Sequence, residues 1–322
     1  MPKLPLQGIR VLEFGVVWAG PYCAAFLAGM GAEVIKIESI KKFIPMTRGQ
    51  IPRPTGEDLR NLPTSVGATP DRLPGKRPWN RIPLFNAHAS NKLGMTVDLL
   101  QPNGKRALMD LIAISDVIVE NNPTETMEKL EISYEEIRET NPGLIMCRMP
   151  AYANEGPYQN HRSFGFHIEG VVGHTLLRGY SDMDPSGVTS VLMGDAASGT
   201  QGAFAVLSAL HHRRRTGKGQ LIELSQAENL IPFMGEAFMD YTMNGRNQST
   251  LGNRHPVAIQ GCYPCLGEDR WVTITIAGDD DWRGLCQAMG DPEWSQESGF
   301  RDPIVRYERH DEIDEQISQW TR

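Results

Sequence analysis

Short apolar runs alternate with helical patterns along the first 150 residues. Residues 9–15 predict a buried strand, residues 19–32 predict a helix with proline in its first turn, and residues 33–39 predict a second strand. A strand–helix–strand unit favours a right-handed crossover and a parallel sheet. We therefore predict an α/β protein with a doubly wound, Rossmann-like large domain. Its later elements are expected at residues 93–99, 103–114, 116–121, 133–141 and 143–152.

Residues 40–85 interrupt this alternation. They carry eight prolines and little periodicity, so we expect a long excursion with little regular structure. Residues 41–92 hold ten Lys and Arg against three acids, in a chain whose net charge is −7. A solvated loop explains this surplus of positive charge, and so does a local binding surface for a polyanionic small molecule. The negative net charge argues against general nucleic-acid binding.

The second half of the chain has a different pattern of predicted helices and strands. A helix is expected to follow Asp195 and to reach about residue 215, and Ser225-x-x-Glu228 resembles a capping box for a helix that ends near residue 244. Beyond Gly252 the sequence predicts strands within residues 261–278 and then two helices. We expect two domains, residues 1–225 and residues 226–322, the second made of a linker helix and a smaller α+β domain. The last helical pattern ends without a cap, which suggests a missing C-terminal return segment.

Composition excludes several classes of protein. No run of eighteen apolar residues predicts a membrane span, and the N-terminus does not resemble a signal peptide. Five scattered cysteines do not form a disulfide framework, which fits a reducing cytoplasm. Cys262-x-x-Cys265 has no second ligand pair, so small apolar fillers are expected there instead of zinc ligands. The sequence predicts a cytoplasmic protein that uses no metal.

Three common motifs are absent from the sequence. Gly15 and Gly20 are five residues apart, whereas the dinucleotide fingerprint requires G-x-G-x-x-G for the backbone to approach a pyrophosphate. Neither a phosphate-binding loop nor the G-x-S-x-G of serine hydrolases is present. These absences argue against a nicotinamide or flavin cofactor.

Asp195 is the residue that suggests chemistry. It stands between an apolar run and a helical pattern, and an Asp before "AASG" is usually a helix N-cap. A helix start also supplies unpaired N–H groups and a positive dipole end, which keep a carboxylate ionised and stabilise an oxyanion beside it. Ala196, Ala197 and Gly199 leave room for a substrate. Both a cap and a nucleophile fit this pattern.

Residues 192–230, "LMGDAASGTQGAFAVLSALHHRRRTGKGQLIELSQAENL", resemble the signature of the family III CoA-transferases, the group that contains formyl-CoA transferase and the carnitine CoA-transferases. Further blocks resemble the same family in order along the chain: residues 8–38, "MTRG" (46–49), "NKLGMTVDL" (91–99), "DVIVENN" (116–122), "GNRHP" (252–256) and residues 263–278.

This resemblance implies that Asp195 is the catalytic nucleophile. Asp195 would attack the thioester carbonyl of an acyl-CoA, giving a mixed anhydride and CoA thiolate. The thiolate would then form an aspartyl-CoA thioester, from which a small carboxylic acid takes the CoA. The reaction implies coenzyme A or acyl-CoA as substrate and no metal or redox cofactor. The family also implies an interlocked homodimer, or a heteromer with a homologous subunit.

The resemblance further assigns CoA contacts. Val17, Trp18 and Ala19 match the stretch that lies against CoA, and Val97 to Leu100 match the segment beside the adenine. Lys129 matches a phosphate partner and Arg162 a basic residue near the pantetheine. The full set of expected contacts is Val17, Trp18, Ala19, Val97, Leu99, Leu100, Asn121, Asn122, Lys129 and Arg162.

Departures from the family pattern leave alternatives open. Ser39 stands where formyl-CoA transferase carries arginine, and the 40–85 connector is longer than usual. The family includes α-methylacyl-CoA racemases, which pair the same Asp with a His to move an α-proton. Phe164 occupies that His position, while His167 lies three residues away and is expected to be a buried, hydrogen-bonded His unless it acts as the base. Glu169 is either structural or orients substrate. A non-catalytic subunit of a heteromeric CoA-transferase is the third alternative.

Overall fold

The chain forms two compact units. The computed structural model describes residues 3–63, 69–188 and 191–322. The first unit comprises residues 1–172 and 190–238, and the second comprises residues 173–189 and 239–322. The second unit therefore takes a short segment that precedes Asp195 in the sequence.

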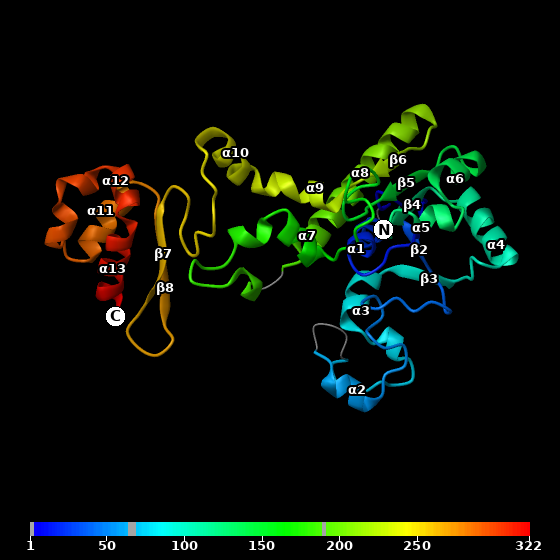
Figure 1. Cartoon of the computed structure of the whole chain (residues 1–322), viewed down its shortest axis with the longest axis horizontal. Coiled ribbons are helices and arrows are strands. Elements are labelled where there is room, and N and C mark those ends of the chain that lie inside the picture. Colours follow the sequence, from blue (N-terminus) through cyan, green and yellow to red (C-terminus); the bar gives the residue numbers. More distant parts are fainter. Residues whose placement is uncertain (1–2, 64–68, 189–190) are drawn as a thin grey trace. The chain divides into compact units, whose positions relative to one another are not determined.

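A six-stranded parallel sheet forms the centre of the first unit (Figure 1). The strand order is β3-β2-β1-β4-β5-β6, and every neighbouring pair is parallel. This order confirms the predicted doubly wound α/β fold, with its switch point between β1 and β4. The strands are β1 (Arg10–Glu13), β2 (Glu33–Glu38), β3 (Lys92–Thr96), β4 (Val117–Glu120), β5 (Ile145–Arg148) and β6 (Leu221–Glu223).

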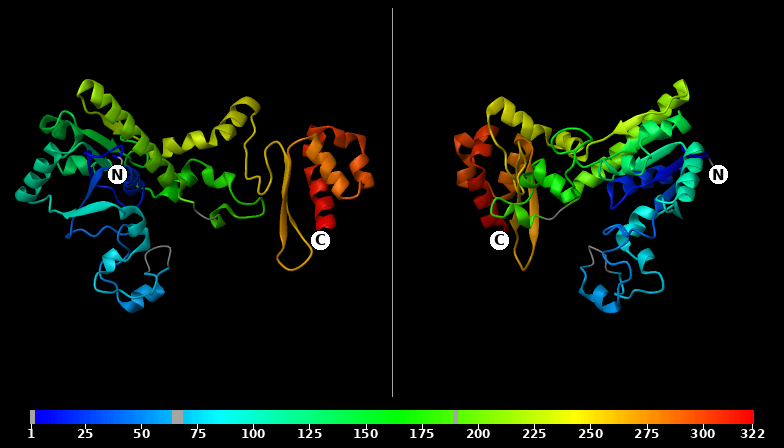
Figure 2. Two further views of the ribbon diagram at one scale, coloured as in Figure 1. Left: turned by 180° about the vertical axis from the view of Figure 1, so that it is seen from behind. Right: turned by 45° about the vertical axis from the view of Figure 1, so that its right-hand side comes forward.

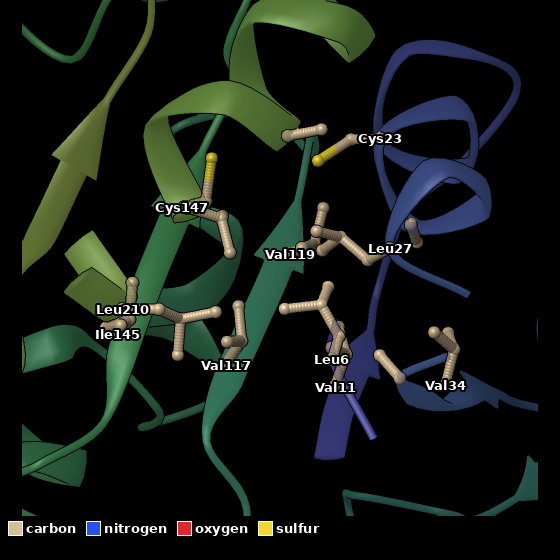
Figure 3. Close-up of a cluster of buried hydrophobic side chains, with 14 of the residues drawn as sticks. Leu6, Val11, Cys23, Leu27, Val34, Val117, Val119, Ile145, Cys147 and Leu210 are labelled. Carbon is tan, nitrogen blue, oxygen red and sulfur yellow. The ribbon is translucent and has the colours of Figure 1, made fainter. Parts of the chain in front are cut away.

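Helices cover both faces of this sheet. On one face, α1 (Ala19–Gly29) and α8 (Met193–Thr216) pack on alternate strand residues such as Val11, Val119 and Cys147, and Figure 3 shows these side chains pointing toward Cys23 and Leu27 of α1. The neighbouring strand positions, Leu12, Ile118 and Met146 among them, face the opposite core. That core is closed by α4 (Pro102–Ala113), α5 (Thr126–Lys129) and α6 (Tyr134–Thr140). Burial on both faces explains why the central strands β1, β4 and β5 are largely apolar at successive positions.

Of the two helices predicted from capping boxes, one agrees with the sequence expectation and one differs from it. The Ser133 capping box of α6 is confirmed, and Ser225 is the N-cap of α9 (Gln226–Leu230). However, the helix expected to run to residue 244 is divided into α9, a 3-10 turn η5 (Ile231–Met234) and α10 (Gly235–Asn244). Pro232 lies in that turn, and proline lacks the N–H that would continue an α-helix.

The 40–85 excursion carries more regular structure than expected. It contains α2 (Gly56–Asn61) and the 3-10 turn η2 (Pro78–Asn80), and α3 (Pro83–Ala89) begins at its end and precedes β3. Residues 64–68 of this excursion lie outside the described residues. In Figures 1 and 2 the α2 end extends away from the β3 edge of the sheet.

The second unit is a small α+β structure. An antiparallel hairpin of β7 (Ile259–Pro264) and β8 (Trp271–Ile276) packs with α11 (Asp279–Ala288), α12 (Pro303–Glu308) and α13 (His310–Thr321). Its core includes Tyr263, Trp282, Phe300, Ile313 and Ile317. Among the described residues, no helix combines the length and apolarity needed to cross a membrane.

A buried charge cluster joins three neighbouring strands. The carboxylate of Glu13 on β1 lies 2.7 Å from Nζ of Lys36 on β2 and 2.7 Å from Nζ of Lys92 on β3. Lys36 also donates to the carbonyl of Gly15, and Lys92 donates to the carbonyl of Pro21. Because one carboxylate serves two ammonium groups, removing it would leave two buried cations without a counter-charge.

We predict that Glu13→Gln lowers the free energy of unfolding by about 3–5 kcal/mol, the usual cost of breaking a buried ion pair from one side. Glu131→Gln is the matched control, because Glu131 pairs with Lys105 at an exposed site where its side chain is 70% exposed. Chemical unfolding followed by circular dichroism measures both variants. Equal losses in the two would contradict the structural role of the cluster.

Candidate active site

Helix α8 begins two residues before Asp195. Its N-cap is Leu192, with a left-handed backbone (φ 52°), and Asp195 is the third residue of the helix. The backbone N–H of Met193 donates to the carboxylate of Glu169, which is fully buried on α7 (Gly165–Val171). The interpretation of Asp195 as the N-cap is therefore wrong, because Leu192 occupies the cap position and Glu169 binds the first amide.

The Asp195 carboxylate is held by two other helices. Its side chain is buried, with 8% of the residue exposed. It accepts hydrogen bonds from the backbone N–H groups of Ala19 and Gly165, the first residues of α1 and α7. Neither helix has an acid in its own first turn. Two helix N-termini, each with unpaired amides and a positive dipole end, thus meet at one carboxylate.

Glycines permit these close approaches. A Cβ on Gly165 would overlap Oδ2 of Asp195, so only glycine allows this amide to reach the carboxylate. A Cβ on Gly199 would lie 3.0 Å from the carbonyl oxygen of Ala19 and 2.8 Å from the ring of Tyr22. The space at Gly199 is therefore filled by α1, contrary to the expectation that it leaves room for substrate. Gly165 could not be identified from the sequence, because its role depends on a contact between segments that are distant along the chain.

Opposing effects set the pKa of Asp195. Burial raises this pKa most, the Ala19 amide lowers it, the nearby charge of Glu169 raises it and the Gly165 amide lowers it, and together these effects move the pKa from 3.8 to about 6. The carboxyl is consequently ionised at neutral pH, although water does not solvate it fully. A carboxylate that is ionised and poorly hydrated has the properties of an activated nucleophile.

The turn before α1 contains several predicted CoA contacts. The Asn121 amide binds both backbone groups of Val16, accepting from its N–H (2.8 Å) and donating to its carbonyl (3.0 Å). Val17 has a left-handed backbone (φ 57°). Trp18 is the N-cap of α1 and packs edge-on against His88, and Ala19 donates to Asp195. The structure gives these residues a role in shaping the turn, and their contacts with CoA stay predictions.

A pocket of about 540 Å³ opens at the carboxyl ends of β1, β2, β3 and β4, next to this turn. The structure brings six of the predicted residues together in its lining: Val97, Leu99, Leu100, Asn122, Lys129 and Arg162. It also places Lys41, Lys42, Phe43, Ile44 and Arg48 there, which the sequence comparison did not assign. The surplus of Lys and Arg in residues 41–92 was the signal that pointed to this segment.

The Lys and Arg side chains that line the pocket form ion pairs of different strength. Lys41 lies 2.6 Å from Asp98, while Lys129 and Arg162 lie 3.3 and 3.5 Å from the shared carboxylate of Glu125. The side chains of these three cations are 66–75% exposed. Exposed pairs of this kind contribute little to stability, so these cations can turn to an anionic ligand.

Arg48 is bound more firmly than these cations. Its guanidinium bonds the Glu38 carboxylate through two nitrogens and donates to the carbonyl of Trp79 and to Asn80. It also lies 3.7 Å over the ring of Phe85. This arginine ties the end of β2 to η2 and α3.

His167 and Glu169 lie on the helix that begins at Gly165. His167 is exposed, contrary to the expectation of a buried His, because α7 directs it away from the core; its Nδ1 accepts the N–H of Phe164 at 3.1 Å. Glu169 is buried against the start of α8. Their roles in catalysis stay predictions. Within residues 3–63, 69–188 and 191–322, no three His, Cys, Asp or Glu side chains are grouped to hold a metal ion.

Known proteins resemble this chain along nearly its whole length. The family model for CoA-transferase family III matches residues 6–322. The succinyl-CoA–D-citramalate CoA-transferase of Chloroflexus aurantiacus is 32% identical over 321 residues, covering 99% of this chain and 73% of that protein. The succinyl-CoA–L-malate CoA-transferase beta subunit of the same organism is also 32% identical, over 98% of this chain and 73% of that protein. A CAIB/BAIF family protein from Brucella suis shares the fold, with a TM-score of 0.80, 26% identity, and coverage of 99% of this chain and 79% of that one.

We predict that Asp195→Asn stabilises the fold at pH 8. The pKa in the folded state, about 6, lies above the ordinary 3.8, so stability is lost as the pH rises between these values, by about 3 kcal/mol in total. The Asn variant does not lose this stability. Its free energy of unfolding should therefore exceed that of the parent by up to about 3 kcal/mol at pH 8, and the two should be equal near pH 4. Thermal unfolding from pH 4 to 8 measures it, with the exposed Asp110→Asn as control. A difference independent of pH would contradict the burial of an ionised carboxylate.

Proposed function

The chain belongs to CoA-transferase family III, and we propose that it moves CoA from an acyl-CoA donor to a carboxylic acid through an aspartyl-CoA thioester on Asp195. The family match confirms the resemblance drawn from the sequence, and the names of the relatives confirm that the chain is a CoA-transferase. The observation that carries the proposed mechanism is the buried Asp195 carboxylate at two helix N-termini.

The site supports each step of this mechanism. Asp195 attacks the thioester carbonyl, the C–S bond breaks, and CoA leaves as thiolate while a mixed anhydride forms. The thiolate then attacks the aspartyl carbonyl and expels the donor carboxylate. The acceptor carboxylate attacks the resulting aspartyl thioester, and CoA thiolate returns to the acceptor, which restores Asp195. The aspartyl oxygen becomes an oxyanion in the later steps, where the Ala19 and Gly165 amides supply N–H donors.

The 540 Å³ pocket is the proposed site for the nucleotide end of CoA. Its volume lies in the range of small-molecule sites. Val97, Leu99 and Leu100 offer apolar surface, and the loosely paired Lys129 and Arg162 offer positive charge for phosphate groups. Gly15 and Val16 line the pocket, and Ala19, three residues further on, contacts Asp195. We propose that the pantetheine arm follows this turn from the pocket to the carboxylate.

We propose succinyl-CoA, or another dicarboxylyl-CoA, as donor and a small dicarboxylic acid as acceptor. This substrate class rests on the names of the two relatives, which pair succinyl-CoA with D-citramalate or L-malate.

A second chain, either another copy or a homologous subunit, is the proposed partner. Helix α10 has no buried residue although it carries Phe238, Met239, Tyr241 and Met243, which are 47–72% exposed. A cluster of exposed large apolar side chains often marks an interface. One relative is itself named as a beta subunit. We propose the cytoplasm as the compartment, since all five cysteines are free thiols.

We predict that Asp195→Asn loses at least about 10³-fold in kcat for CoA transfer, because an amide cannot act as the nucleophile. Incubation of the parent with succinyl-CoA and hydroxylamine should inactivate it, with the modification at Asp195 located by peptide mass spectrometry. Asp110→Asn should retain parent activity. An Asn variant that transfers CoA at the parent rate would exclude this mechanism.

The same preparation separates the transferase from a racemase. A racemase exchanges the α-hydrogen of a 2-methylacyl-CoA for deuterium in D2O without any acceptor acid, whereas a transferase requires the acceptor. We expect acceptor-dependent CoA transfer without such exchange, measured by mass spectrometry of the thioester.

We predict that Lys129→Ala raises the KM for acyl-CoA about tenfold, the loss of one charge-assisted contact to phosphate. It should not change kcat/KM for the matching acyl-pantetheine, which lacks the nucleotide. Lys218→Ala, which removes an exposed lysine in the turn after α8, is the control. Equal effects on acyl-CoA and acyl-pantetheine would place the phosphate site elsewhere.

A further inference from the structure

The backbone at Val17 determines where the Ala19 amide points. Val17 follows the end of β1 and turns the chain into α1 with a left-handed backbone (φ 57°). This conformation is unfavourable for a β-branched residue and persists only where neighbouring groups hold it. Ala19, two residues later, donates its N–H to Asp195.

Thr47, in the 40–85 excursion, holds that turn. Its Oγ1 accepts a hydrogen bond from the N–H of Val17 at 3.0 Å, and only 8% of the residue is exposed. Thr47 lines the 540 Å³ pocket and also a second, much smaller pocket that Val17 lines with it. The hydroxyl therefore lies in the wall between the pocket and the turn.

The neighbours of Thr47 fix its own position. Met46 donates its N–H to the carbonyl of Gly49 at 3.1 Å, which closes a tight turn around Thr47. Arg48 bonds Glu38 at the end of β2 and stacks on Phe85 of α3. On the other side, Asn121 holds Val16 through both of its backbone groups. Val16 and Val17 are thus held from two different segments, and Thr47 supplies the second contact.

We propose that Thr47 is a positioning residue for the nucleophile, acting through the Val17 and Ala19 amides. The proposal rests on the proposed function in taking Asp195 as the nucleophile. It assigns to the MTRG turn a role in orienting the Asp195 carboxylate, beyond lining the pocket.

A consequence is that the loss of the Thr47 hydroxyl weakens the Ala19–Asp195 contact. In Thr47→Val the Val17 N–H loses its acceptor while the side-chain shape is preserved, so the strained turn relaxes. The Ala19 amide normally lowers the pKa of Asp195, so its withdrawal raises that pKa. A residue that only fills space would change stability without moving the titration of Asp195.

Selective labelling tests this without relying on activity. Trp18-Ala19 is the only Trp–Ala pair in the sequence, so labelling with carbonyl-13C Trp and 15N Ala gives one amide signal, that of Ala19. In the parent this signal should titrate with a midpoint near pH 6, and Asp195→Asn should abolish the titration. In Thr47→Val the midpoint should rise by about half a pH unit or the amplitude should fall by about half. Thr47→Ser keeps the hydroxyl and should match the parent.

Kinetics provide the second readout. We expect kcat to fall about tenfold in Thr47→Val, with the acid limb of its pH profile moved to higher pH, and to return within about twofold in Thr47→Ser. Thr140→Val, at the exposed end of α6, is the matched control and should behave as the parent. If Thr47→Val does not fold, Thr47→Ala replaces it with the same expectations.

The outcomes separate the two proposals. An unchanged Ala19 titration in a folded Thr47→Val, or an equal change in Thr47→Ser, would overturn the role of Thr47. A parent that shows the Ala19 titration but no CoA transfer would instead overturn the proposed function and leave the contact between Thr47 and the turn intact.

Discussion

The contact between the buried Asp195 carboxylate and the first amides of α1 and α7 is the constraint on which the rest of the site depends. Burial alone would protonate this acid near neutral pH and remove its nucleophilicity. The two amides oppose that effect and hold the pKa at about 6. Both amides must reach the same side chain, so the turn before α1 and the glycine that begins α7 are restricted in conformation and in size.

The edge of the sheet links this carboxylate to the pocket. Lys36 lies in the buried cluster with Glu13 and also lines the pocket, so the same ion pairs that join the strands form part of its floor. The pocket's outer cations are paired with acids of the protein itself, such as Asp98 and Glu125. Because the side chains of Lys41, Lys129 and Arg162 are 66–75% exposed, their ion pairs with these carboxylates are weak, and a polyanion can compete for the cations and bind reversibly.

The order of strands and helices in the large unit could be predicted because its buried strands are apolar on both faces and its helices carry local start and stop signals. The arrangement of the site was harder to predict from the sequence. The roles of Gly165 and Thr47 depend on contacts with residues 30 positions away in the chain. Local propensity favoured a cap at Asp195, but a tertiary contact from Glu169 occupies that end of α8. Lys41 and Lys42 lie in a connector whose path no periodicity predicts.

The position of Asp195 inside α8 has a chemical consequence. An N-cap carboxylate binds amides of its own helix, and its geometry is then fixed by that helix. Here Glu169 takes the first amide of α8, and Asp195 is left to amides that come from α1 and α7. Those amides stand at the ends of separate segments, and each is held in place, the first by the contacts of Val16 and Val17 and the second by the close approach at Gly165. In the proposed mechanism, donors fixed in this way stabilise the aspartyl oxyanion without having to reorganise.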